Sequence, residues 1–153
     1  MQAVRLKKEN VGYFFSSILN SYSQIFFSTH KPFAVILLIV TFYDIHAGLA
    51  GLLAVVTTSC AAFILNLHRP TTAQGFYGFN SLLVGLGLGI YYSFGVHLFV
   101  IILLAALFTF FISVSLQGVI GKYGLPYLSV PFILALWIFI TATRSFDALG
   151  ISE

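Results

Sequence analysis

Long apolar runs that carry almost no charge constrain this sequence more than any other feature. Of its 153 residues, 59% are hydrophobic and only 7% are charged, and the mean hydropathy is +1.03. A water-soluble domain of this length carries roughly a quarter charged residues, so this chain lacks the polar surface that would cover a globule in water. The composition therefore predicts an all-α integral membrane protein.

The apolar runs divide the chain into a short N-terminal segment and five longer ones. Residues 1–10 are expected to form a cytoplasmic tail. Residues 11–30 are expected to form a re-entrant or interfacial helix, because serine, asparagine and glutamine interrupt this segment. Five spans are expected within residues 32–143, at 33–43, 47–67, 75–92, 95–116 and 128–143. With a polar tail at 144–153, the chain reads as a single transmembrane domain over residues 1–153.

The basic residues are distributed unevenly between the two sides that five crossings would create. One side collects Arg5, Lys7, Lys8, Lys31, Arg69 and Lys122, whereas the other collects Arg144. Cytoplasmic loops carry an excess of lysine and arginine, so we place the N-terminus in the cytoplasm, in a bacterial inner membrane or another plasma membrane. No signal peptide is expected, because no convincing cleavage site follows the basic N-terminus. The weak basicity does not predict a nucleic-acid partner.

Three stretches place polar or helix-breaking residues at membrane depth. They are SQIFF at 23–27, GFYGFNSLLVG at 75–85 and LPYLSVPF at 125–132. Pro126 and Pro131 should loosen the start of the last helix and free carbonyl groups that need partners. Asn80 is expected to link its helix to its surroundings, while Gly85, Gly87 and Gly89 should let a neighbouring helix come close.

An enzyme is the weakest interpretation of this sequence. No acid–base cluster, nucleophile constellation or metal-ligand spacing occurs within the spans, so we expect no metal and no cofactor. Asp44 and His46 lie at a predicted turn without a third ligand nearby. Cys60, the single cysteine, lies in an apolar run and is expected to be an inert packing residue.

Taken together, the three stretches resemble the urea transporter family. The likeness rests on SQIFF with a following proline, on YGFN-x-LLVG and on LPxLSxPF, in this order and spacing, and it covers residues 20–143. It implies one repeat of an inverted-repeat fold, with five transmembrane helices plus a re-entrant half-helix, most similar to the first half of the family's architecture. The chain departs from the family pattern at His30, Ser81 and Ser129, where the family commonly has asparagine, glycine and threonine.

The resemblance also implies roles for individual residues. Gln24 would present its amide to a pore at the end of the half-helix, with the aromatic Phe27 close by. Phe79 and Leu83, four residues apart on one helix face, would line a flat apolar slot, and the Ser129 hydroxyl would lie at the pore centre. From the residues alone, a packing role for the pair and a bridging role for Gln24 stay open. Asn80, Pro126 and Pro131 would be structural.

The function implied by the resemblance is passive, channel-like transport of urea. A narrow aromatic slot admits a planar neutral solute, and a line of acceptors replaces its lost water. This chain would supply one half of the pore in a fixed orientation. A complementary half would come from a second chain or from a repeat lost with truncation, and the family suggests a homotrimer. The alternatives are transport of another small neutral solute, such as ammonia or a short amide, and a non-transporting assembly subunit.

Overall fold

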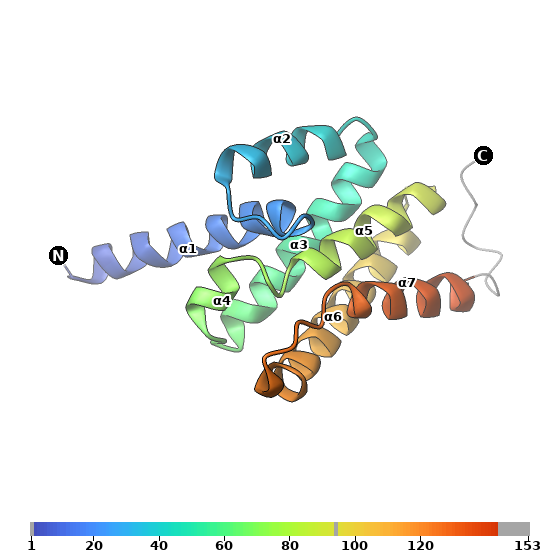
Figure 1. Cartoon of the computed structure of the whole chain (residues 1–153). Coiled ribbons are helices and arrows are strands. Elements are labelled where there is room, and N and C mark those ends of the chain that lie inside the picture. Colours follow the sequence, from blue (N-terminus) through green and yellow to red (C-terminus); the bar gives the residue numbers. More distant parts are fainter. Residues whose placement is uncertain (1, 94, 144–153) are drawn as a thin grey trace.

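The computed structural model of this chain describes residues 2–93 and 95–143, which fold as helices joined by short turns (Figure 1). The expected tail at 144–153, including Arg144, lies outside the described residues. In chain order the elements are α1 Gln2–Gln24, α2 Lys31–Thr41, α3 Ile45–Ile64, α4 Arg69–Ala73, α5 Phe79–Tyr91, α6 Val96–Val119, the 3₁₀ turn η1 Gly121–Tyr123 and α7 Val130–Thr143.

Two of these helices are long and apolar enough to cross a membrane. They are α3, with 20 residues, and α6, which continues through η1 to Tyr123 over 28 residues. An α-helix rises about 1.5 Å per residue and the hydrocarbon core is about 30 Å thick, so α2, α5 and α7, with 11, 13 and 14 residues, are shorter than a full crossing. The described residues form helices joined by turns, without strands, and their two membrane-length helices are consistent with an all-α membrane protein. The count of five spans and the re-entrant helix stay predictions.

The shortening of α5 and α7 has a local cause in each case. The expected span at 75–92 becomes helical only at Phe79, because Gly75 has a φ of +82° and the chain turns before α5. The last helix begins at Val130, since Leu128 has a φ of +48°. Glycine adopts a positive φ freely, whereas leucine does so under strain.

Two boundaries in the N-terminal half differ from expectation. The first helix begins at Gln2, so residues 2–10, which were expected to form a tail, are helical and belong to the same helix as residues 11–24. Between the expected spans 47–67 and 75–92, Arg69–Ala73 forms the short helix α4. Proline in a first helical turn is tolerated because its missing N–H would have no partner there, and Pro70 holds such a position.

Asp44 caps α3 by accepting hydrogen bonds from the backbone N–H groups of His46 and Ala47 at 2.9 and 3.1 Å.

The contact between α3 and α5 is the most extensive between two helices and lies at the centre of the molecule (Figure 1). Small residues face each other along it. A methyl group added to Gly85 would lie 2.5 Å from the Ala50 carbonyl oxygen and 2.7 Å from the Ala54 Cβ. A methyl group added to Gly89 would lie 2.7 Å from the Ala50 Cβ. The expected close helix approach is therefore confirmed for Gly85 and Gly89 of α5, which lie against α3.

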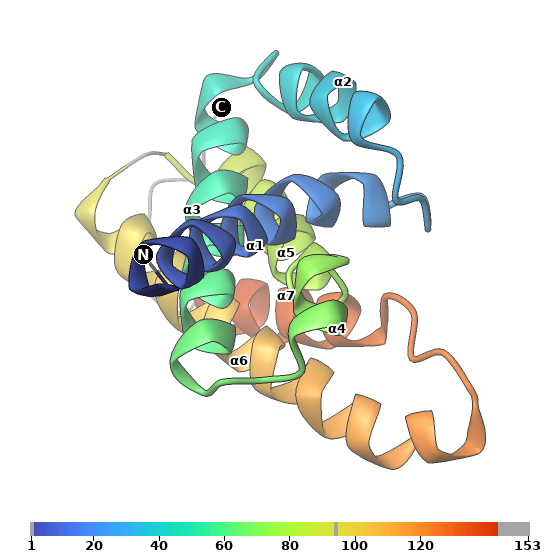
Figure 2. The same cartoon turned by 90° about the vertical axis from the view of Figure 1, so that its left-hand side faces the viewer.

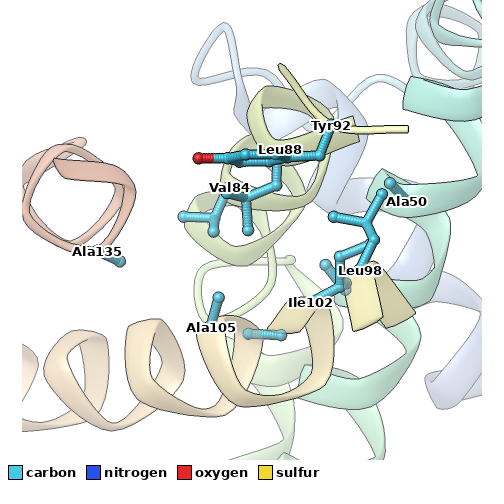
Figure 3. Packing of buried hydrophobic residues seen from close by; sticks show 10 residues of the cluster. Ala50, Val84, Leu88, Tyr92, Leu98, Ile102, Ala105 and Ala135 are labelled. Atoms are coloured by element: carbon cyan, nitrogen blue, oxygen red, sulfur yellow. The ribbon is translucent and has the colours of Figure 1, made fainter. Parts of the chain in front are cut away.

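Side chains of α3, α5, α6 and α7 form the main apolar core around this contact (Figure 3). Its buried members are Ala50, Ala54, Val84, Leu88, Tyr92, Leu98, Ile102, Ala105, Ala106 and Ala135. The Ser81 hydroxyl donates to the Ala106 carbonyl at 3.1 Å and so joins α5 to α6 inside this core. Cys60 lies outside it with an exposed side chain, so the packing role predicted for its thiol within this chain is wrong.

The α1 helix runs from the edge of the molecule to its centre, where its C-terminal end meets α2 and α3 (Figures 1 and 2). Tyr22, Ala34, Val55 and Leu82 form a second buried cluster there, drawn from four different helices. The hydroxyl groups of Ser17 and Ser59 form a hydrogen bond of 3.2 Å between α1 and α3. The fold therefore places the C-terminal end of α1 beside the start of α5.

We expect Gly85→Ala to lower the free energy of unfolding by about 1–3 kcal/mol, the usual cost of inserting a methyl group into a packed contact. Thermal or denaturant unfolding in detergent micelles would measure it. Gly118→Ala is the matched control, because a methyl group there meets no atom within 4 Å, and alanine favours a helix by up to about 1 kcal/mol over glycine. Equal stabilities for the two variants would contradict a close α3–α5 contact.

Candidate functional site

The chain leaves α1 through a tight turn that places Phe27 in a left-handed conformation. The Ser28 N–H donates to the Ser23 carbonyl at 3.1 Å, and the Phe27 N–H donates to the Gln24 carbonyl at 2.9 Å. These two bonds form a Schellman motif, in which the residue after the helix usually is glycine. Phe27 instead has a φ of +54°, and its side chain is 62% exposed. A strained residue with an exposed aromatic ring is a frequent mark of a functional site.

A second strained residue lies in the loop before α7. Leu128 has a φ of +48°, and two hydrogen bonds attach its loop to the first turn of α5 and to the segment before that helix. The Asn80 amide Nδ2 donates to the Leu128 carbonyl at 3.1 Å, and the Tyr127 hydroxyl donates to the Phe76 carbonyl at 2.8 Å. Asn80 donates toward the Leu128 loop, and Tyr127 donates from that loop back to Phe76. We call this pair of hydrogen bonds the double clamp, and it holds Leu128 in its strained conformation.

Both strained residues line one hollow of ≈ 80 Å³. The space exceeds several-fold the about 10–15 Å³ that one water needs. The full lining consists of Phe27, Phe76, Phe79, Gln117, Pro126, Tyr127 and Leu128. Four segments far apart in the sequence therefore meet here: the turn after α1, the start of α5, the end of α6 and the loop before α7.

Three of the residues predicted from the sequence lie together at this hollow, namely Phe27, Phe79 and Pro126. Phe79 is only 3% exposed, so it forms the wall on the side of the bundle. Gln24 is buried one turn before Phe27, with 3% of its surface exposed. Ser129 is half-buried and follows Leu128 directly.

The remaining predicted residues lie farther from the hollow. Leu83 is half-buried one helical turn beyond Phe79 and is not among the lining residues. Asn80 and Pro131 are buried and are not among the lining residues. The Asn80 amide thus uses its N–H to hold Leu128, while its oxygen Oδ1 is buried without a partner among the described residues.

Sequence reasoning missed four lining residues: Phe76, Gln117, Tyr127 and Leu128. Three of them lie inside the stretches at 75–85 and 125–132: Tyr127 and Leu128 are adjacent to predicted residues, and Phe76 is three positions before Phe79. Gln117 comes from α6, and its only signal in the sequence is that an amide stands near the end of the most apolar run. Its approach to residues about 40 positions earlier depends on the packing of α6 against α5.

The chemistry of the lining suits a small, uncharged solute. Aromatic rings and prolyl and leucyl side chains make up most of the wall, and no charged side chain is among the lining residues. Gln117 and Tyr127 contribute the polar side chains of the lining, and the Tyr127 hydroxyl donates to the Phe76 carbonyl. An apolar slot with a few oriented polar groups selects by shape and hydrogen bonding, because an ion would lose its water without compensation.

Membrane-length apolar helices and a small uncharged hollow define this chain as a helical membrane protein with a candidate solute site. Comparison with known proteins adds the family. The profile described as "Urea transporter" matches residues 15–153. The chain therefore belongs to the urea transporter family.

Relatives of known name agree with this assignment. Urea transporter 1 of Ovis aries is 27% identical over 135 residues, which are 85% of this chain and 35% of that protein. Urea transporter 1 of Mus musculus is 27% identical over 138 residues, which are 88% of this chain and 36% of that protein. The chain thus spans about a third of the length of the curated relatives it matches.

We expect Tyr127→Phe to destabilise the double clamp by about 1–2 kcal/mol, because the partly buried hydrogen bond to the Phe76 carbonyl is lost. The matched control is Tyr123→Phe, since the Tyr123 side chain is exposed in the neighbouring turn. Thermal unfolding in detergent would compare the two variants. If both lost the same stability, the hydrogen bond to Phe76 would not hold this loop.

Proposed function

We propose that this chain forms one half of a passive pore for urea. The observation that carries the proposal is that two strained residues, Phe27 and Leu128, line one uncharged hollow together with the buried ring of Phe79. Backbone strain of this kind costs about 1–3 kcal/mol per residue, and here it is concentrated at the aromatic hollow of a chain that belongs to the urea transporter family.

Urea fits the lining by shape and by hydrogen bonding. It is planar and neutral, so it can pass between aromatic faces that exclude a hydrated ion. It has four N–H donors and needs acceptors in place of water. Gln24, three residues before Phe27, and Ser129, directly after Leu128, would supply an amide and a hydroxyl along the path. Leu83 would extend the apolar wall one turn deeper. No ion or proton needs to be coupled, so the flux would follow the gradient of the solute.

A second unit would complete the pore. Phe27 and Leu128 line the hollow and are exposed, so a second unit could cover this aromatic and aliphatic surface. The 135 matched residues make up 35% of the Ovis aries relative, so that protein has room for another unit of this size. An odd number of spans, five with the short helices counted, would make the two units insert in opposite orientations.

The membrane arrangement follows from this proposal. The α1 helix would be the re-entrant half-helix, with its C-terminal end and Gln24 at the pore. The N-terminus would lie in the cytoplasm, in agreement with the charge bias of the sequence. We further propose that complete pores assemble as homotrimers in a bacterial inner membrane or another plasma membrane.

Urea uptake by proteoliposomes tests the pore assignment, with the chain measured alone and together with a unit that completes the pore. We expect Phe27→Gly to lower the urea flux by up to about tenfold, since one aromatic contact is worth roughly 0.5–1.5 kcal/mol. Glycine accepts the positive φ of this position, so the thermal stability should not fall. Phe26→Ala is the matched control, because Phe26 is equally exposed one position earlier.

Gln24→Ala and Ser129→Ala are expected to lower the same flux. Unchanged flux in both variants, with normal insertion, would refute their roles in the pore. A series of solutes separates urea from ammonia and short amides, since a slot shaped for urea should slow as the solute becomes bulkier. A correctly folded chain that carries no solute in any pairing would instead indicate an assembly subunit.

A further inference from the structure

A second hollow, of ≈ 130 Å³, lies at the C-terminal end of α3 and differs in chemistry from the first. Its lining is partly apolar, partly polar and carries one positive charge. The lining residues are Tyr13, Ala62, Phe63, Asn66, Leu67, Arg69 and Thr72. None of them lines the hollow at Phe27, so this site has no part in the proposed pore.

The floor of this hollow is fixed by the way α3 ends. Asn66 has a φ of +49°, a conformation that asparagine tolerates better than most residues. The Leu67 N–H donates to the Ala62 carbonyl at 3.1 Å, and the Asn66 N–H donates to the Phe63 carbonyl at 3.1 Å. These bonds form a Schellman motif, and Leu67 packs against the buried cluster of Ala62, Tyr77 and Phe110. The hollow is therefore preformed by backbone hydrogen bonds and core packing.

Arg69 has no carboxylate partner among the side chains that the structure describes. Asp44 is the one carboxylate within residues 11–93 and 95–143, and it caps the opposite end of α3. Twenty residues of helix separate the two ends, a distance of about 30 Å. Among the side chains that the structure describes, none neutralises the Arg69 guanidinium, which suits it to bind an anionic ligand.

The sequence of α1 adds further positive charge. Arg5, Lys7 and Lys8 belong to α1, and the helix rise places their backbone positions roughly 8–12 Å along the axis from Tyr13. Tyr13 itself lines the hollow. With Glu9 counted against these three basic residues, the segment keeps a net charge of +2, which favours an anionic ligand.

The position of the hollow matches the boundary between hydrocarbon and headgroups. The α3 helix is long and apolar enough to cross the membrane, and Ile64, at its C-terminal end, is 82% exposed. An isoleucine so exposed suits contact with acyl chains. Arg69 lies five residues later, where basic residues interact with anionic headgroups.

We propose that this hollow binds an anionic phospholipid. The lipid phosphate would pair with the Arg69 guanidinium, a planar group that binds phosphate by two parallel hydrogen bonds. Asn66 and Tyr13 would contact the polar headgroup and glycerol region. Phe63 and Leu67 would contact the first carbons of the acyl chain. This site is independent of the proposed urea pore, and its test needs no solute flux.

The experiment compares the full chain in nanodiscs of phosphatidylcholine with nanodiscs that contain phosphatidylglycerol, and counts retained lipids by native mass spectrometry. We expect Arg69→Gln to lower the retention of phosphatidylglycerol about fivefold, the change that corresponds to about 1 kcal/mol per basic group near a membrane surface. Lys122→Gln is the matched control, because Lys122 is also a basic residue just after a long helix but lines neither hollow.

Each outcome decides the proposal. A selective loss in Arg69→Gln, with Lys122→Gln unchanged and Arg69→Lys intermediate, supports it. An equal loss in Arg69→Gln and Lys122→Gln would overturn it in favour of diffuse surface charge, as would retention that does not depend on headgroup charge.

A competition with inorganic phosphate, added to the protein in detergent, separates a lipid from a soluble anion. If free phosphate at millimolar concentration displaced the lipid completely, the site would be one for soluble phosphate. If Arg69→Gln failed to fold, Arg69→Lys against Lys122→Arg would replace the comparison.

Discussion

The close approach of α3 and α5 is the constraint on which the rest of this structure depends. Without side chains at Gly85 and Gly89, the backbone of α5 can lie against Ala50 and its neighbours on α3. Helices in lipid gain little from apolar burial, because the lipid is itself apolar, so such contacts depend on dense packing of small residues. This contact places the start of α5 beside the end of α1, and Phe79 and Phe27 meet at one hollow as a result.

Two hydrogen bonds keep the backbone of Leu128 in its strained conformation, and their donors are Asn80 and Tyr127. Asn80 is in the first turn of α5, and its amide holds the carbonyl of Leu128. Tyr127 is buried and binds back to the segment before α5. The surrounding structure therefore over-determines an unfavourable conformation, which is the condition under which strained backbone persists. A site formed in this way is pre-organised before a solute arrives.

Much of the fold could be predicted from the sequence, because lipid imposes simple rules. The lengths of α3 and α6 follow from apolar runs without proline, and the glycines of the 75–92 segment predicted a close contact. The early start of α1 at Gln2 and the existence of α4 were not predicted, since their sequences are polar or contain proline. Helical spacing paired Phe79 with Leu83, yet only Phe79 lines the hollow. The place of Gln117 in the lining of the hollow could not be predicted from the sequence, because it depends on how α6 packs against α5.

The turn at Phe27 has a consequence for the rotation of α1. Because this turn and α2 fix the helix at its C-terminal end, the angular position of Gln24 around the axis is set from that end. A residue inserted close before Gln24 would rotate everything upstream by about 100° and leave Gln24 in place. A residue inserted near position 5 would rotate only the few residues before it. The N-terminal turns of α1 can therefore vary in length without changing which side of the helix faces the site.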